Sequence, residues 1–211
     1  MFAFFKSSLR RPHDETPFRS IPLRLCLFPS IQAHAQCGVH CGTERWKVKT
    51  LTDSTVGNID PAEITKTINW FRTRTRPESL PNTRRLVGIE TMTFKVKGRV
   101  VAFKREGGSH GDRDFHVVIA QLNNPSKTMV VEFADPECAS VCGSEFLSQI
   151  KQARQDFIDQ VGQPTGTFKE PDERIVIEVI GIGFFDRLHG QRGMAPSGIE
   201  IHPVLSMRVI P

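Results

Sequence analysis

The chain has 211 residues, 38% of them hydrophobic and 24% charged, with a formal net charge of +5. These values fit one domain of ordinary size plus an extension, and no apolar run approaches the roughly 20 residues that a membrane-spanning helix requires. Three of the surplus positive charges fall within residues 1–35, so the rest of the chain is only weakly basic. The charge therefore neither demands nor excludes an anionic partner such as a nucleic acid.

Residues 1–35 show neither a helical nor a strand period, so we do not assign them to the fold. A short apolar run from Ile21 to Phe28 follows basic residues, and Ala33-His34-Ala35 has the small-x-small form of a signal-peptidase site. Arg24 and neighbouring prolines interrupt the run, and a disordered tail or an upstream extension of the reading frame are the alternatives. A working leader predicts a periplasmic or secreted protein, and a failed one predicts a cytoplasmic protein.

The cysteines bear on the same question. Cleavage after Ala35 would remove Cys26 and leave Cys37, Cys41, Cys138 and Cys142, which form two C-x-x-x-C pairs. An even number permits two disulfides, local or crossed, as an oxidising compartment favours. The alternatives are unpaired thiols and a zinc site, although structural zinc sites usually place two residues between paired cysteines.

We assign residues 36–86 to an N-terminal extension. Glu44 to Thr50 alternates in polarity, which predicts a short edge strand. Asp60-Pro61-Ala62-Glu63 has the residues of an N-cap, a first-turn proline and a capping box, which predicts a helix to about Phe71. Arg72 to Arg85 is basic and punctuated by prolines, as is typical of a solvated linker.

Residues 87–211 predict a mainly β domain with one core helix. The predicted strands are Glu90 to Lys104, Asp114 to Leu122, Thr128 to Phe133, Arg174 to Gly183 and Gly198 to Ile210. Ser144 to Val161 predicts a helix with Ser144 as its N-cap and with Phe146, Ile150 and Phe157 in the core. Three strands, a helix and two strands is the order of the OB-fold, a five-stranded, partly open Greek-key barrel. The alternative is a small α+β sheet with one packed helix.

The last thirty residues hold the densest chemistry. Asp186 and His189 adjoin a glycine-rich loop, where they either contact a ligand or only shape the loop. Glu200 stands two residues before His202 in the last predicted strand. Because successive strand side chains point to opposite faces, Glu200 and His202 share one face. The other face is predicted to hold Ile199, Ile201, Pro203, Leu205 and Met207.

A second set of candidate ligand-binding residues lies in the predicted second and third strands. Asp114 and His116 share a strand face, and a carboxylate beside an imidazole can raise its basicity or help to bind a metal. Glu132 is expected on the same polar face. Each residue alone could also be an ordinary strand side chain, but clustered acids and imidazoles are costly to bury and therefore indicate a site.

Several motifs resemble those of a group of small, uncharacterised bacterial proteins that often carry export leaders. The shared motifs are Cys41-Gly42-x-Glu44-Arg45-Trp46, Asp112-x-Asp114-Phe115-His116, Glu132-Phe133-x-Asp135-Pro136-x-Cys138 and the run from Gly183-Phe184-Phe185-Asp186 to His202-Pro203-Val204. The resemblance spans about residues 37 to 207. It implies an exported location and carries no established activity.

No phosphate-binding loop, nucleophile elbow, dinucleotide fingerprint or His-Glu-x-x-His helix occurs in the sequence. We therefore interpret the chain as a non-enzymatic binding module whose ligand contacts the sheet and the loop from Asp186 to Gly198. The chain has no tyrosine, and Phe115 and Phe133 are predicted to face the core. This argues against a nucleic acid and leaves protein, glycan and small-molecule ligands open.

The alternative is a metal-dependent hydrolase, conceivably directed at phosphodiesters. In it His116, His202 and Glu200 would hold a divalent metal or act as acid and base, and Asp186 would orient water. A third interpretation is a structural domain associated with the cell envelope, whose polar residues hold the terminal loop in shape.

Overall fold

A computed structural model describes residues 40–42, 44–107 and 111–211. All of these residues belong to one unit of the chain, residues 35–211. The predicted leader at residues 1–35 and the candidate Cys37 lie outside the described residues.

The described part of the chain is mainly β, with six strands and three α-helices. The strands are β1 (Asp60–Thr65), β2 (Met92–Arg105), β3 (Phe115–Gln121), β4 (Asn124–Phe133), β5 (Val176–Phe185) and β6 (Ile199–Ile210). The helices are α1 (Trp46–Lys49), α2 (Ile68–Arg72) and α3 (Leu147–Gln160). All five strands predicted within residues 87–211 are present, because each had either a clear alternation or a fully apolar run.

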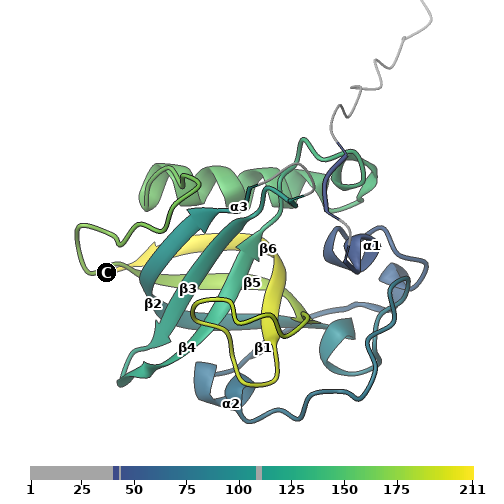
Figure 1. The fold of residues 1–211 in the computed structure, drawn as a ribbon, viewed down its shortest axis with the longest axis horizontal. Helices are drawn as coiled ribbons and strands as arrows, with labels where there is room; N and C mark the ends of the chain where they lie inside the picture. The colour runs from purple at the N-terminus through teal and green to yellow at the C-terminus, as the bar shows by residue number, and fades with distance from the viewer. Residues whose placement is uncertain (1–39, 43, 108–110) are drawn as a thin grey trace, which may run out of the picture. The chain divides into compact units, whose positions relative to one another are not determined.

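The six strands form one sheet in the order β1-β2-β3-β4-β6-β5, and β2 also pairs with β5. The pairings therefore run in a closed ring through β2, β3, β4, β6 and β5, to which β1 adds at the start of β2 (Figure 1). The β1–β2 and β4–β6 pairs are parallel and the other pairs are antiparallel.

Strand β2 takes part in two sections of the ring because it changes partner near Gly98. Its first half, Thr93 to Arg99, pairs with β5, and its second half, Arg99 to Arg105, pairs with β3. A Cβ atom at residue 98 would lie 2.9 Å from Cβ of Ile119. The close approach of β3 therefore requires a glycine at this position.

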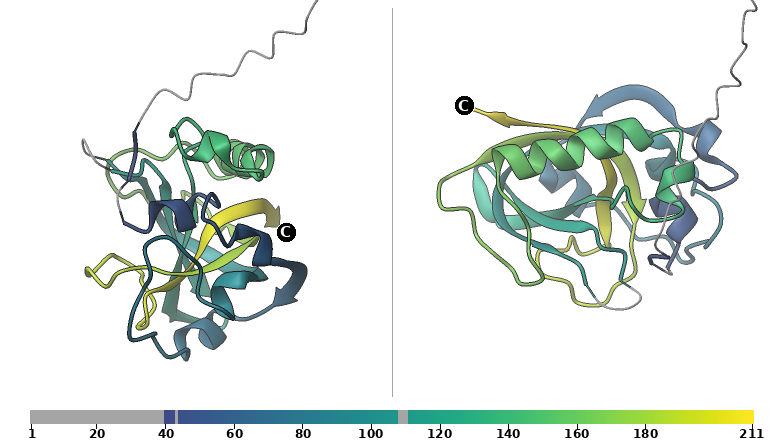
Figure 2. Two further views of the ribbon diagram at one scale, coloured as in Figure 1. Left: turned by 90° about the vertical axis from the view of Figure 1, so that its right-hand side faces the viewer. Right: turned by 90° about the horizontal axis from the view of Figure 1, so that it is seen from above.

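Helix α3 lies across one end of the strands, on the outside of the ring, in all three views (Figures 1 and 2). Its Phe157 is fully buried and contacts the rings of Phe103, Phe115 and Phe133 on β2, β3 and β4. The predicted core helix is therefore confirmed, and Ile150 is buried with it.

The start of this helix differs from the prediction. Ser144 is not the N-cap; the helix begins at Leu147 with Phe146 as its N-cap residue. The hydroxyl of Ser144 instead accepts a hydrogen bond from the amide of Phe146 at 3.3 Å, because a 3₁₀ turn ends just before Ser144 and delays the helix. Phe146 is only partly buried.

Two predictions in the N-terminal extension are wrong. Glu44 to Thr50 is not an edge strand, because α1 forms there and buries Val48 against the interior. Asp60 to Thr65 is not helical, because its backbone pairs with β2 as β1. The helix begins only after Thr67, whose hydroxyl accepts the amide of Trp70 at 3.1 Å. In both places contacts distant in sequence outweigh the local pattern.

The arginine-rich segment from Arg72 to Arg85 is more than a solvated linker, because three of its arginines hold neighbouring backbone. Arg72 donates to the carbonyl of Thr128 at 2.6 Å, and Arg76 donates to the carbonyl of Asp186 at 2.6 Å. Arg85 is buried, donates to the carbonyl of Glu90 at 3.2 Å and forms an ion pair of 3.0 Å with Asp53.

Candidate functional site

Five polar side chains are buried where β3, β4 and β6 lie next to one another. We call them the buried array: Asp114, His116, Glu132, Glu200 and His202. Strand pairing brings them together, because His116 faces Glu132 across β3 and β4, and β4 pairs directly with β6. All five were candidates from the sequence. The position of β4 between β3 and β6 is what brings Asp114, His116 and Glu132 next to Glu200 and His202.

The alternation of β6 holds at Glu200 and His202 but changes after them. Gly181 pairs with Val204 and Gly183 with Ile201, so the register shifts between these two pairs. As a result Val204 and Met207 join Ile199 and Ile201 in the main apolar core, whereas Leu205 belongs to a second apolar cluster and not to the face predicted for it.

Glu132 is the centre of the buried array. Its Oε1 lies 2.9 Å from Nδ1 of His116, and its Oε2 lies 2.9 Å from Nδ1 of His202. Oε1 of Glu200 lies 3.3 Å from the same Nδ1 of His202. Across the ring, Nε2 of His202 lies 3.1 Å from Oδ2 of Asp114. Both nitrogens of His202 therefore face carboxyl groups, an environment that favours the imidazolium.

The pKa values of the array follow from this geometry. Burial lowers the pKa of His116, but the hydrogen bond and the charge of Glu132 outweigh it and raise this pKa to about 9. Burial likewise lowers the pKa of His202, but its three carboxyl neighbours raise it well above the usual value. Glu132 shifts in the opposite direction, because Lys49 and the two histidines overcome burial and hold its pKa well below the usual value.

The pKa values of the other two carboxyl groups are raised, so that of the two only Glu200 is mostly protonated at neutral pH. Burial, followed by the charge of Asp112, raises the pKa of Asp114 to about 7. Burial, followed by the charges of Glu132 and Asp186, raises the pKa of Glu200 to about 8. Near neutral pH the array therefore balances its two imidazolium ions with Glu132 and keeps Glu200 mostly protonated.

The array is closed to solvent. None of its five side chains belongs to a residue with more than 1% of its surface exposed. His116, His202 and Glu200 therefore have no direct access to a substrate in this structure, which removes the geometric basis for using these three as the catalytic residues of a hydrolase.

An accessible pocket of about 160 Å³ lies beside the array. We call it the loop pocket; it is lined by Gly42, Glu44, Lys49, Glu106, Gly111, Asp112, Asp186, His189 and Gln191. The lining residues come from the segment around α1, the β2–β3 connection and the β5–β6 connection. Four of them are acidic and one is a lysine, so the pocket carries excess negative charge with its histidine neutral.

Lys49 links the loop pocket to the buried array. Its Nζ lies 3.1 Å from Asp112, 3.8 Å from Asp186 and 3.9 Å from Glu132. Burial lowers the pKa of Lys49, but the surrounding carboxylates outweigh it and raise the pKa well above the usual value. The strand prediction for this segment missed this residue, because the carboxylates that surround it come from distant segments of the chain.

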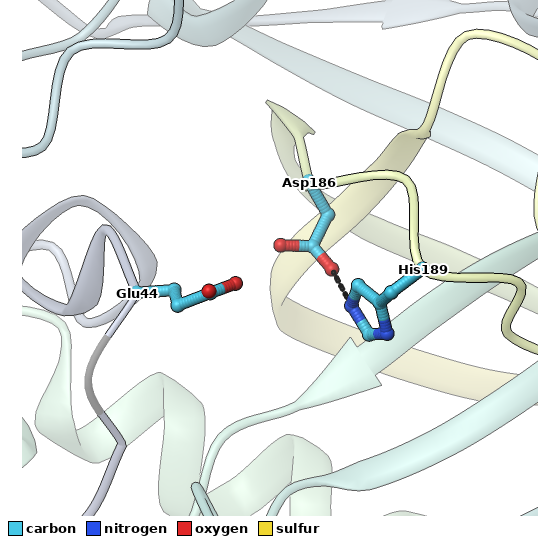
Figure 3. Close-up of side chains that lie close together, drawn as sticks. All are labelled: Glu44, Asp186 and His189. Atoms are coloured by element: carbon cyan, nitrogen blue, oxygen red, sulfur yellow. Dashed lines mark hydrogen bonds and ion pairs between the residues drawn. The ribbon is translucent and has the colours of Figure 1, made fainter.

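Asp186, His189 and Glu44 form the acidic wall of the pocket (Figure 3). Nε2 of His189 lies 3.2 Å from Oδ2 of Asp186, and the side-chain amide of Gln191 donates to the same oxygen at 3.4 Å. Asp186 is buried, whereas the side chains of His189 and Glu44 are 50% and 44% exposed. The structure thus places the predicted pair Asp186 and His189 at an accessible site and joins Glu44 to it.

The terminal loop is held against the ring by contacts on both sides. Arg76 donates to the carbonyls of Asp186 and Ser197 at 2.6 and 2.8 Å. Nε2 of His116 donates to the carbonyl of Arg192 at 3.1 Å, given that Glu132 holds the other ring nitrogen. Gly193 has a φ of 85°, and a Cβ there would lie 2.3 Å from the side chain of Val118. The loop glycine therefore serves close packing.

A buried ion pair fixes the other side of the pocket. Arg45, which directly follows Glu44, forms hydrogen bonds of 2.6 and 2.8 Å with the two carboxylate oxygens of Glu90. Arg45 also donates to the carbonyl of Phe185 at 2.8 Å, and Glu90 accepts the amide of Phe185 at 3.0 Å. The pair therefore positions Glu44 and α1 relative to Asp186. Sequence reasoning missed it, because 45 residues separate Arg45 from Glu90.

A disulfide joins Cys41 to Cys138, with 5.5 Å between their Cα atoms. It ties the segment beside the pocket residue Gly42 to the loop after β4. The prediction of disulfides is confirmed for these two cysteines. Two sulfurs bonded to each other cannot both act as thiolate ligands, so this structure does not form the four-thiolate zinc site. Cys142 is also disulfide-bonded.

Comparison with protein-family models and with curated protein sequences gave no match for this chain. Among the described residues, no helix combines the length and the apolar character that crossing a membrane requires. The geometry of the loop pocket and of the buried array is therefore what indicates the function of this chain.

Proposed function

We propose that this protein is an extracytoplasmic binding module with an OB-like fold, and that its ligand occupies the loop pocket. The order of pairing around the ring supports the OB-like assignment. If β2, β3, β4, β5 and β6 are taken as the first to fifth strands, the third lies beside the fifth and the first beside the fourth. Helix α3 connects the third and fourth strands, as in an OB-fold.

The single observation that carries the binding function is the position of the loop pocket. Two of its walls are the connections between the first and second and between the fourth and fifth strands of the ring. OB-folds bind oligonucleotides and oligosaccharides with these same two connections. The pocket also combines a concave shape with converging polar groups, as binding sites do.

The charge of the lining residues indicates which class of ligand the loop pocket favours. Its four acidic side chains, Glu44, Glu106, Asp112 and Asp186, outnumber the single Lys49, and none of the lining residues is phenylalanine, tyrosine or tryptophan. An oligonucleotide needs a positive groove and stacking surfaces, so this pocket favours a neutral or cationic polar ligand.

The disulfide supports the proposed location. A cross-link between Cys41 and Cys138 persists in oxidising compartments and is rare in the cytoplasm. The resemblance to exported bacterial proteins points to the same compartment.

Ligand titration of the disulfide-intact full chain, followed by ¹⁵N–¹H correlation spectra, tests the proposed function. The probes are maltotriose, spermidine and uridine monophosphate at millimolar concentration, each tested in the presence of a chelator and again with added ZnCl₂. Maltotriose or spermidine is expected to shift amide signals of the loop pocket, and Glu106→Gln is expected to weaken spermidine. Glu145→Gln, which alters an exposed residue that does not line the pocket, is the matched control. Preferential binding of the nucleotide in the presence of chelator, or no shift with the other two probes in either condition, would contradict the proposal.

A metal-dependent hydrolase is a second candidate, favoured by the contact of His189 with Asp186 at the pocket wall. A carboxylate that orients an accessible imidazole is a common arrangement for a general base. Hydrolysis of bis(p-nitrophenyl) phosphate in the presence of Mn²⁺, abolished by His189→Ala, is the result that would favour this function over binding alone.

A further inference from the structure

We infer that Glu44, Asp186 and His189 form a binding site for a divalent transition-metal ion, and that a neutral ligand of the loop pocket binds through this ion with one of its oxygen atoms. The inference rests on the proposed function for its second part only. The metal site stands on the geometry of the three side chains and their surroundings.

The donor atoms have the spacing that one ion needs. One ligand atom from each residue lies within 4.8 Å of the other two, and the carboxylate of Glu44 points toward the other two side chains in Figure 3. Two bonds of about 2.1 Å separate their donor atoms by about 3 Å at a right angle and about 4.2 Å in line. The 3.2 Å between Asp186 and His189 matches adjacent positions, and the half-exposed Glu44 is free to make the remaining adjustment.

The charges around these residues call for a cation. Glu44 and Asp186 direct carboxylates at the same space, and like charges at this separation repel. Lys49 lies 3.8 Å from Asp186 but is closer to Asp112, so it compensates this wall only in part. Arg187 lies 3.1 Å from Glu44 at the exposed rim, where water screens the pair.

Two further acceptor atoms in the same pocket lack partners. Oδ1 of Asp112 and the side-chain carbonyl oxygen of Gln191 are buried and accept no hydrogen bond within the described part of the chain. Both residues line the loop pocket. Such oxygens are costly to bury without a donor or a cation, and water bound to a metal ion supplies donors. This observation is independent of the Glu44, Asp186 and His189 spacing.

The chemical types of the three donor groups indicate which class of metal ion they favour. One imidazole with two carboxylates suits Zn²⁺ or Mn²⁺ better than Ca²⁺ or Mg²⁺, which prefer oxygen ligands alone. Gln191 donates to Asp186, and Arg76 holds the backbone carbonyl of Asp186, so the central ligand is oriented by its neighbours. Three protein ligands beside an open pocket leave coordination positions for an oxygen of the bound ligand.

The second group of suitable spacing does not make an equivalent site. Asp114, Glu132 and His202 also lie within 4.8 Å of one another, but all three are closed to solvent. Both nitrogens of His202 already face carboxyl groups. An ion would have to displace the protons of the array and has no path to it, so we assign the metal to the accessible group.

Calorimetric titration of the chelator-treated, disulfide-intact full chain with MnCl₂ and with ZnCl₂ tests the site. One ion per chain is expected, with weaker binding of CaCl₂ and MgCl₂. His189→Ala and Glu44→Gln are each expected to weaken Mn²⁺ binding by about 10-fold or more. Glu145→Gln removes the same charge at an exposed position elsewhere and is expected to bind as the wild type does. Because His189 and Glu44 are half exposed, both variants should melt at nearly the wild-type temperature without metal.

The outcomes separate the two proposals. Absence of saturable Mn²⁺ and Zn²⁺ binding, or equal affinity in wild type, His189→Ala and Glu44→Gln, overturns the metal site. If maltotriose or spermidine still binds in the presence of chelator, the proposed function survives that failure. If the ion binds as expected but neither probe binds with or without it, the binding module fails and the metal site stands.

Discussion

Replacement of Glu132 by glutamine tests the central charge of the buried array. The two side chains have nearly the same shape, so the variant Glu132→Gln removes the charge and leaves the packing. In the wild type this carboxylate contacts His116 and His202 at 2.9 Å each, in an environment closed to solvent. The variant leaves two buried imidazolium ions without their shared counter-ion.

The expected cost is several kcal/mol. Removing one partner of a buried ion pair destabilises a protein by about 3–5 kcal/mol. The contribution of His116 to this loss of stability can be worked out separately, because its pKa is about 9 in the folded chain against an ordinary value of 6.5. This difference corresponds to about 3 kcal/mol. We expect Glu132→Gln to lower the free energy of unfolding by about 3–5 kcal/mol at pH 6.

The loss of unfolding free energy caused by Glu132→Gln should decrease as the pH rises. The raised pKa of His116 means that its stabilisation is fully present below pH 6.5 and is lost as the pH rises through about 9. Asp114 and Glu200, with pKa values raised to about 7 and 8, hold protons in the folded chain that the unfolded chain releases. Wild-type stability therefore falls between pH 6 and pH 9, and the variant falls less.

Urea denaturation of the disulfide-intact chain at pH 6, 7.5 and 9, followed by circular dichroism, measures both effects. Glu145→Gln is the control, since it removes an exposed carboxylate. A cost below about 1 kcal/mol at pH 6 would show that the histidines do not depend on Glu132. A cost that stays constant up to pH 9 would refute the assignment of the charged imidazole.

Two further substitutions test the packing around the site by the same denaturation assay. Phe157→Ala is expected to lower the free energy of unfolding by about 3–5 kcal/mol, because the ring is fully buried among three phenylalanines. Phe168→Ala, at a partly exposed ring, should lower it clearly less. Similar losses in the two variants would contradict the position of α3. Arg45→Met is expected to cost about 3–5 kcal/mol, because it leaves Glu90 buried without its partner. Arg187→Met, at an exposed ion pair, should cost about 1 kcal/mol or less, and equal costs would argue against a buried pair.

The strands of the ring could be predicted because their information is local. β3 and β5 are nearly continuous apolar runs, and β6 alternates at Glu200 and His202, so burial on one or both faces appears in the residue pattern. The same local logic failed at Asp60, whose side chain does accept the amide of Ala62 at 2.9 Å, as a turn-forming aspartate would. The backbone of this segment instead pairs with the edge of β2, and no local sequence pattern indicates that this edge is available.

The candidate site was predictable in its parts but not in its assembly. Alternation identified Glu200 with His202 and Asp114 with His116, while the contact between the pairs depends on β4 lying between β3 and β6. Lys49 was missed for a related reason. Its charge is typical of a surface, and only the convergence of Asp112, Asp186 and Glu132 from distant segments makes a buried lysine stable.

Two of the three segments that line the loop pocket are held by interactions within the fold. The disulfide of Cys41 and the ion pair of Arg45 fix the segment that carries Glu44 and Lys49. Arg76 fixes the backbone at Asp186, where the terminal loop leaves β5. These anchors keep the carboxylates of Glu44 and Asp186 close together although they repel, and such a cost persists only where the surrounding structure determines it. Closing the ring of strands does not require the segments of Glu44 and Asp186 to lie together. The fixed positions of these two carboxylates are therefore the strongest structural argument for a bound cation at this pocket.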